Sequence, residues 1–257
     1  MLGRKQRISN QDWLDAIRGI ERSCSRSHIN ELTARTVAEI RQRCLGKKTA
    51  YAWSGGKDSI VLGDLCEKAG VNQSVLVVCD LEYPAFLQWV SENKPKGLEI
   101  VNTGQDLEWL SKHPEMLFPK KSDVAAKWFH IVQHRGQAIY YKKHALDMII
   151  LGRRKADGNF VGRGSNIYTN AQGVTRYSPI SGWTHEEVLA YIHYNNLPMP
   201  LIYDWKNGYL CGTHQWAARQ WTGTTENGWR EVYDIDRSIV EKAARIIPSA
   251  RDFLSKL

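Results

Sequence analysis

Short apolar runs alternate with helical patterns through the middle of the chain. Two of these runs, VLVVC at 75–79 and MIIL at 148–151, are apolar on both faces, as in strands buried inside a parallel sheet. Strands that alternate with helices predict an α/β protein with an open, mostly parallel sheet, in which ligands bind at the carboxyl ends of the strands. The predicted strands are Thr49–Trp53, Val75–Cys79, Leu98–Val101 and Met148–Leu151, and the helices between them follow Ser59 and cover 84–93 and 134–147.

The pattern before the first strand is helical. Residues 10–47 predict two helices. Ser9 and Asp12 resemble a capping box, and Asn30 is expected to cap the second helix. The apolar residues of the first helix follow at helical spacing as Trp13, Ile17 and Ile20. We therefore expect a basic helical segment over 1–47 and a single α/β domain over 48–257.

The pattern after residue 151 is less regular. Residues 152–178 predict loops, and Thr184 with Glu187 predicts a capping box at the start of a helix. A last helix is expected over 235–246, and the Trp-rich region before it is expected to cover the strand ends. Its tryptophans can stack on bases or fill a core, and both interpretations stay open. The residues concerned are Trp183, Trp205, Trp216, Trp221 and Trp229.

The net charge of +8 is unevenly distributed along the sequence. Residues 1–50 contain eleven Lys or Arg and five Asp or Glu, which gives +6, whereas the other 207 residues carry +2. A basic segment of this kind can dock a nucleic acid or nucleoprotein partner, or it can form a solvated helix face. The charge pattern leaves both alternatives open.

Several classes of protein are disfavoured by composition. No apolar run approaches the ~20 residues that span a bilayer, and the basic start lacks the apolar core of a signal peptide. We therefore expect a cytoplasmic protein without a membrane partner. The five cysteines contain no C-x-x-C pair, which disfavours a disulfide framework, a structural zinc site and an iron–sulfur cluster.

The sequence SGGKDS at 54–59 is the strongest chemical signal. It places a glycine-rich turn between a predicted strand and a predicted helix. Glycines allow close approach of backbone to a phosphate, and the N–H groups of a helix N-terminus point at the anion. The motif does not fit G-x-x-x-x-G-K-[ST], so a Walker-type triphosphatase is not implied.

This motif resembles the PP-loop of the adenine nucleotide alpha-hydrolase-like superfamily. More narrowly, the chain resembles the PAPS reductase (phosphoadenosine phosphosulfate reductase) family over about residues 48–222. The resemblance implies a Rossmann-like fold and a PP-loop nucleotide-binding domain. The supporting stretches are DLEYP at 80–84, LGRRKAD at 151–157, and SPISGWT at 178–184 with its continuation to Asp204.

The resemblance also implies roles for individual residues. The loop would hold phosphates of ATP, or of another adenine nucleotide such as PAPS, and Asp80 would lie at the adenine or ribose. A guanidinium group binds two phosphate oxygens at once, so Arg153 and Arg154 would reach toward the phosphates or the second substrate. Mg²⁺ would bridge phosphate oxygens, with Asp58 and Asp80 as candidate ligands. The predicted catalytic residues are Lys57, Arg153 and Arg154; the predicted nucleotide-binding residues are Ser54, Gly55, Gly56, Lys57, Asp58, Ser59, Asp80 and Gly152.

Two features depart from the family pattern. Reductases of this family carry a C-terminal Glu-Cys-Gly-[Ile/Leu]-His segment, whereas this sequence has no cysteine after Cys211. Cys211, three residues before His214, is either a reactive thiol or a structural cysteine. Arg163 and Arg176 flank a Gly/Asn-rich loop and are further candidate anion contacts.

The sequence thus favours an enzyme that cleaves ATP at the α-phosphate, releases pyrophosphate and activates a substrate. As an ATP pyrophosphatase or adenylyltransferase, such a transferase would act in sulfur metabolism or in sulfur modification of nucleic acid, by phosphorothioation or thiolation. The first alternative is a reductase of PAPS or a related sulfonucleotide. The second is a non-catalytic nucleotide-binding subunit that docks nucleic acid or a partner. The acceptor and any homo-oligomeric state are left open.

Overall fold

The computed structural model describes residue 2, residues 8–220 and residues 222–257 of the 257-residue chain. The chain forms two compact units, each built from three stretches: unit 1 from 1–76, 92–100 and 139–200, and unit 2 from 77–91, 101–138 and 201–257. None of the helices in the described ranges combines the length and apolar character that crossing a lipid bilayer requires. The predicted segment 1–47 belongs to unit 1 together with the first strand, and its independence as a domain stays a prediction.

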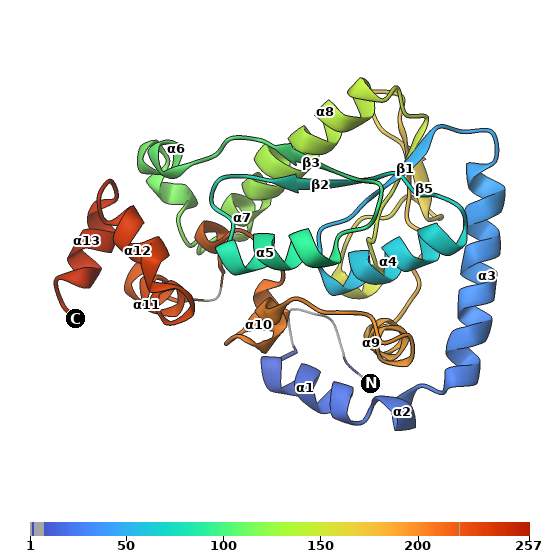
Figure 1. Ribbon diagram of the computed structural model, residues 1–257, viewed down its shortest axis with the longest axis horizontal. Coiled ribbons are helices and arrows are strands. Elements are labelled where there is room, and N and C mark those ends of the chain that lie inside the picture. Colours follow the sequence, from blue (N-terminus) through green and yellow to red (C-terminus); the bar gives the residue numbers. More distant parts are fainter. Residues whose placement is uncertain (1, 3–7, 221) are drawn as a thin grey trace. The chain divides into compact units, whose positions relative to one another are not determined.

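Six strands form one sheet. They are β1 (Thr49–Ala52), β2 (Ser74–Val78), β3 (Leu98–Asn102), β4 (Met148–Ile150), β5 (Ile167–Thr169) and β6 (Thr175–Tyr177). The sheet order is β3-β2-β1-β4-β6-β5 (Figure 1). β1 is parallel to β2 and to β4, and β4 is parallel to β6, which confirms the predicted open, mostly parallel α/β sheet. Because β1 and β4 are parallel neighbours, their carboxyl ends lie at the same edge.

The end of the sheet contains a hairpin that the sequence pattern missed. Residues 152–178 were expected to be loop, but β5 and β6 pair antiparallel, with Tyr168 opposite Arg176. Both strands have only three residues and mix polar with apolar side chains. An alternating pattern needs about four to eight residues to be recognised, so strands of this length give no clear signal.

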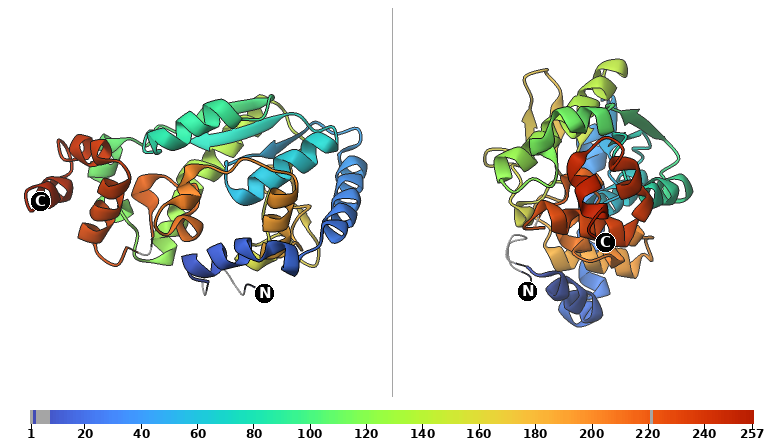
Figure 2. Two further views of the ribbon diagram at one scale, coloured as in Figure 1. Left: turned by 60° about the horizontal axis from the view of Figure 1, so that its bottom comes forward. Right: turned by 90° about the vertical axis from the view of Figure 1, so that its left-hand side faces the viewer.

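The helical prefix lies in unit 1. It consists of α1 (Asn10–Arg18), α2 (Ile20–Ser23) and α3 (Arg26–Cys44). The Ser9–Asp12 capping box is confirmed, but the predicted cap at Asn30 is wrong, because Ser25 caps α3 and Asn30 lies inside that helix. The prefix packs on α9 (His185–Tyr194), whose predicted Thr184–Glu187 capping box is also confirmed. Figure 2 shows α1 and α2 running beside α9.

Unit 2 contains most of the remaining helices. The predicted helix at 84–93 is confirmed as α5 (Pro84–Asn93). The helix predicted at 134–147 is shorter there, since α8 ends at Lys143, and it is preceded by α7 and by a π-helical turn at Phe129–His134. In the range 235–246, where a last helix was predicted, α12 covers Arg237–Ala243, and a further helix, α13, follows it. The helices of this part of the chain are α6 (Leu107–Lys112), α7 (Ser122–Trp128), α8 (Arg135–Lys143), α10 (Gly208–Cys211), α11 (Thr225–Ile235), α12 (Arg237–Ala243) and α13 (Pro248–Leu254).

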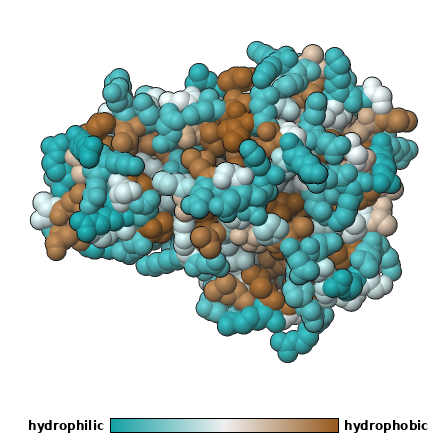
Figure 3. Space-filling view, viewed as in Figure 1, coloured by the Kyte–Doolittle hydropathy of each residue, from teal (hydrophilic) through white to brown (hydrophobic). Residues whose placement is uncertain are grey.

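Aromatic side chains fill much of the core of unit 2. Trp229 is fully buried and meets Phe118 edge-on at 5.1 Å, while Trp216 lies 5.7 Å from it. Trp183 of unit 1 is buried as well, so Trp183, Trp216 and Trp229 have core positions rather than free faces for base stacking. Trp205 is half-buried and meets the Tyr83 ring edge-on at 4.9 Å. Trp221 lies outside the described residues. Figure 3 shows hydrophobic side chains scattered among hydrophilic ones on the face in view.

Candidate nucleotide site

The loop at 54–59 joins β1 to α4 (Lys57–Lys68) in unit 1. Gly55 has a φ of +66°, a left-handed conformation that favours glycine, and Gly56 is the N-cap residue of α4. Ser59 closes the turn: its Oγ accepts from the Ser54 N–H at 3.0 Å and donates to the Gly56 carbonyl at 2.9 Å. The sequence therefore forms a tight turn ahead of a twelve-residue helix, as the motif predicted.

The helix N-terminus at this turn has the character of an anion site. Gly56 offers no side chain to cap the first N–H groups of α4, in contrast to the capped helices α1, α3 and α9. Ser54, Gly56 and Asp58 are half-buried, so the turn is reached from solvent. These features suit a phosphate approaching the backbone.

Gly152, after β4, lies against this turn. A Cβ placed on Gly152 would be 3.3 Å from the carbonyl carbon and oxygen of Asp58. The parallel pairing of β1 with β4 brings these two segments to the same edge of the sheet. The structure thus brings Gly152 together with the loop residues, as the resemblance implied.

Asp58 is held between two cations. Its Oδ1 accepts from the Arg154 Nε at 2.7 Å, and its Oδ2 accepts from the Lys57 Nζ at 2.7 Å. The Lys57 and Arg154 side chains are 4% and 0% exposed, whereas that of Asp58 is 23% exposed. Both carboxylate oxygens of Asp58 are therefore engaged by buried cations, and this donor set does not fit Asp58 as a direct Mg²⁺ ligand.

Arg154 continues the network away from the loop. Its Nη2 lies 3.0 Å from Asp157 Oδ2 and donates to His185 Nδ1 at 3.0 Å, and its Nη1 donates to the Trp183 carbonyl. Burial and the Arg154 charge lower the pKa of His185 to about 4, although Asp157 opposes the shift. His185 is therefore neutral at pH 7, with Nδ1 as the acceptor. In this arrangement Arg154 organises Asp58, and a direct contact of Arg154 with phosphate stays a prediction.

Sequence reasoning missed two members of this cluster. Trp13 of α1 is fully buried, and the Lys57 Nζ lies 5.2 Å from the centre of its ring. The Trp13 and His185 rings meet edge-on at 4.7 Å. In the sequence, Trp13 shows only helical spacing and His185 only a position after a capping Thr, so neither pattern pointed to the loop.

The other predicted arginines of unit 1 lie near the hairpin. Arg153 is half-buried and donates to the Tyr168 hydroxyl at 3.3 Å. Arg176 is buried. Burial, together with the nearby charge of Arg153, lowers the pKa of Arg176. Arg163 is exposed. Arg153 and Arg176 thus lie near each other at the hairpin. A contact of Arg153, Arg163 or Arg176 with an anion stays a prediction.

Asp80 and Cys211 belong to unit 2. Asp80 Oδ1 accepts from the Asn102 side chain at 2.6 Å. Close to it in sequence, Glu82 is buried and accepts from the Cys79 N–H, and burial raises its pKa to about 8. Cys211 is 5% exposed, with its Sγ 3.9 Å from the Gln220 carbonyl. Among the described residues no group of three or more His, Cys, Asp or Glu could hold a metal ion, and the role of Asp80 stays a prediction.

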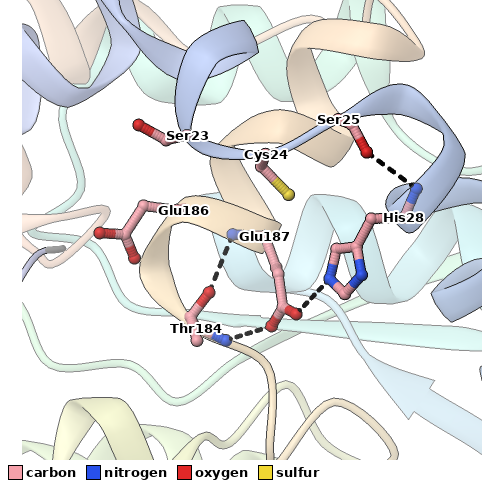
Figure 4. A pocket seen from close by; sticks show the side chains of 7 residues that line it. All are labelled: Ser23, Cys24, Ser25, His28, Thr184, Glu186 and Glu187. Atoms are coloured by element: carbon pink, nitrogen blue, oxygen red, sulfur yellow. Dashed lines mark hydrogen bonds and ion pairs between the residues drawn. The ribbon is translucent and has the colours of Figure 1, made fainter.

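A separate pocket of about 510 Å³ lies where the start of α3 meets the start of α9 (Figure 4). Glu187 crosses it, accepting from the Thr184 N–H at 2.7 Å and lying 2.7 Å from His28 Nε2. These contacts join the first turn of α3 to the capping box of α9. The lining residues are Ser23, Cys24, Ser25, His28, Thr184, Glu186 and Glu187.

Comparisons with known proteins agree with the motif. A family model described as "Phosphoadenosine phosphosulfate reductase domain" matches residues 48–212. Two curated proteins named phosphoadenosine phosphosulfate reductase are similar: that of Emericella nidulans is 28% identical over 122 residues, 48% of this chain and 37% of the relative. That of Saccharomyces cerevisiae is 27% identical over 118 residues, which are 46% of this chain and 42% of the relative. The chain thus spans less than half the length of the curated relatives it matches.

A solved structure supports the same fold. The phosphate complex of phosphoadenylyl-sulfate (PAPS) reductase from Candida auris has a TM-score of 0.51 with this chain at 19% identity. The match covers 70% of this chain and 92% of that one. At this identity the likeness establishes the fold alone.

Proposed function

Because the chain belongs to the phosphoadenosine phosphosulfate reductase domain family, we propose that it is an enzyme that binds ATP at the Ser54–Ser59 loop and cleaves it at the α-phosphate. A substrate oxygen attacks the α-phosphorus, the bond to the bridging oxygen of the β-phosphate breaks, and pyrophosphate leaves. The substrate keeps the adenylyl group and loses its proton to solvent or a base. The family resemblance supports a substrate that belongs to sulfur metabolism or to nucleic-acid sulfur modification.

The arrangement of the loop is the observation that carries this proposal. Gly55 forms the left-handed turn, Gly56 starts α4 without a side-chain cap, and Arg154 holds Asp58 at 2.7 Å. Displacement at phosphorus depends on in-line positioning and charge neutralisation more than on covalent catalysis. A rigid turn at a helix N-terminus supplies such positioning. Mg²⁺ would then be bound through phosphate oxygens as the counter-ion of ATP.

The thiols favour ATP cleavage over sulfonucleotide reduction. A reductase of this family needs a thiolate nucleophile, and a raised pKa suppresses the thiolate. Burial raises the pKa of Cys24, Cys44, Cys66 and Cys79, and Cys211 is 5% exposed. Reduction of PAPS is the second candidate, and the names of the two curated relatives favour it.

Product analysis separates the two functions. We expect the protein to convert ATP and the acceptor to pyrophosphate and an adenylylated acceptor, from which a later displacement releases AMP, and to bind ATP when the acceptor is withheld. Formation of ADP and phosphate would contradict the proposal. Loss of all sulfonucleotide reduction in Cys211→Ser, with PAPS as substrate, would favour the second candidate instead.

A pair of lysine variants on one helix tests the loop. Lys57→Ala removes a cation from Asp58, whereas Lys68→Ala removes a half-exposed lysine that pairs with Asp64 in the last turn of α4. We expect Lys57→Ala to lose ATP binding and turnover and Lys68→Ala to retain both. Circular dichroism checks that both variants fold.

The basic prefix carries a proposal about partners. Residues 1–50 have a charge of +6, which suits a nucleic acid or nucleoprotein partner. We expect affinity for a nucleic acid to fall steeply with salt. Fluorescence anisotropy with labelled DNA and RNA at two salt concentrations measures this affinity.

Nucleotide binding without turnover in any condition would instead support a non-catalytic subunit.

A further inference from the structure

Trp13 links the helical prefix to the loop, although it lies outside the matched family domain, which begins at residue 48. It is the buried residue of α1, a nine-residue helix that is otherwise exposed or half-exposed. The Ser9–Asp12 capping box fixes the start of this helix one turn before Trp13. The anchor of α1 is therefore a single aromatic side chain.

The first contact of Trp13 is with the loop lysine. The Lys57 Nζ lies 5.2 Å from the centre of the Trp13 ring, within the range of a cation–π interaction, and 2.7 Å from Asp58 Oδ2. The lysine side chain is 4% exposed, so this interaction is little weakened by water. The ring covers one side of the ammonium group while the carboxylate holds another.

The second contact is with the far end of the same network. Trp13 meets His185 edge-on at 4.7 Å, and His185 accepts from Arg154, which in turn donates to Asp58. The Nε2 of His185 is buried and has no hydrogen-bond partner in the described part of the chain. Trp13 thus contacts Lys57, which binds Asp58 directly, and His185, which binds the other cation partner of Asp58, Arg154.

We propose that Trp13 is a positioning residue of the nucleotide site, which holds the Lys57 ammonium against Asp58 and so fixes the first turn of α4. This inference rests on the proposed function for its consequence in ATP binding. The helical prefix then contributes to nucleotide binding through Trp13. It supplies an aromatic face from outside the matched residues 48–212.

Chemical labelling of Lys57 tests the contact without any nucleotide. Acetylation by an N-hydroxysuccinimide ester, followed by mass spectrometry, measures how accessible and mobile each lysine amine is. We expect Trp13→Leu to raise the rate at Lys57 by about 2- to 30-fold, the range that the loss of a cation–π contact corresponds to. Trp13→Phe keeps an aromatic face and is expected to stay within about threefold of wild type.

A matched control separates positioning from general loosening. Ile40→Ala removes a fully buried side chain from α3 of the same prefix, next to Arg41, which bonds the Lys68 carbonyl at the other end of α4. We expect it to lower the midpoint of urea unfolding without raising Lys57 acetylation. Equal acetylation in wild type and Trp13→Leu, or an equal rise in Ile40→Ala, would overturn the inference.

ATP affinity provides the second readout. Trp13→Leu is expected to weaken ATP binding by about the same factor as it raises acetylation, and Trp13→Phe to restore it. If wild type binds no ATP, the proposed function fails, while the labelling result still decides the role of Trp13. If wild type binds ATP and Trp13→Leu binds it equally well, the positioning role is overturned and the proposed function stands.

Discussion

Each unit of the molecule contains a buried arginine, and the two differ in what they hold. Arg154 of unit 1 bonds Asp58, whose side chain is 23% exposed and belongs to the first turn of α4. Arg219 of unit 2 bonds Glu231 of α11 at 3.0 Å, and the side chain of Glu231 is 9% exposed. Arg219 also donates to the Lys206 carbonyl at 2.9 Å. The first arginine links the interior to a loop at the surface, while the second links interior groups to one another.

This difference shows what burial of an arginine means. Both guanidinium groups would be costly to bury without partners, so each has carboxylate and carbonyl acceptors. Burial and hydrogen bonding alone therefore do not mark a functional site. We expect a half-exposed partner to distinguish the functional arginine, because such a partner lies where a ligand can reach it.

Removal of each arginine is the largest expected effect. Arg154→Ala leaves Asp58 and Asp157 without their shared cation, and breaking a buried ion pair costs about 3–5 kcal/mol of folding free energy. Arg219→Ala is expected to lower the free energy of unfolding in urea by a similar amount. Only Arg154→Ala should also lose ATP binding, measured by calorimetry at a temperature where both variants are folded. Loss of ATP binding in Arg219→Ala would break the comparison.

A pair of glycine variants gives the next effect. Gly55 in the loop and Gly70 after α4 have φ values of +66° and +89°, and alanine in this region costs about 1–2 kcal/mol. Gly70 has open space around it, so its variant isolates the strain. We expect both variants to lose that stability, and Gly55→Ala alone to weaken ATP binding by about tenfold or more. Equal ATP affinity in the two variants would mean that the conformation of Gly55 is not needed for ATP binding.

The pH dependence of stability is expected to have opposite signs in the two units. Burial raises the pKa of Glu82 in unit 2 from 4.5 to about 8, so the folded state binds the proton more tightly and stability falls as pH rises through this window. His185 in unit 1 has its pKa lowered to about 4, so its contribution is lost as pH falls from 6.5. Each slope is about 1.4 kcal/mol per pH unit at most.

Glu82→Gln tests the alkaline side of this prediction. The amide is neutral at every pH, so the variant should be more stable than wild type at pH 8 and similar at pH 5, by urea unfolding. His185→Asn should likewise flatten the acid side between pH 6.5 and 4. A wild-type slope of unchanged size in Glu82→Gln would mean that another group titrates there.

The sequence predicted those parts of the molecule whose cause is local. The capping boxes at Ser9 and Thr184 are confirmed, because each depends on residues three positions apart. The apolar runs predicted the buried strands, and the loop at 54–59 was recognised from its glycines. The cap at Asn30 failed because Ser25, five residues earlier, caps the helix instead.

The parts that the sequence did not predict depend on contacts between distant residues. Trp13 reaches Lys57 across 44 positions and His185 across 172, and no periodic pattern encodes such contacts. Arg154 was expected to reach a ligand because a guanidinium binds phosphate, but its neighbours in the fold are Asp58 and Asp157. The residue type predicted the chemistry, and the topology decided which groups it serves.

The interleaving of the two units along the chain has a consequence for biosynthesis. The third stretch of unit 1 ends at residue 200, and it contains β4, β6 and α9. On a ribosome, β1 and the glycine turn therefore emerge long before the strand and the helix that complete their surroundings. A nascent chain must keep β1 from non-native pairing until then, so a translational delay between β1 and residue 200 is expected to lower the yield of native protein more than a delay after residue 200.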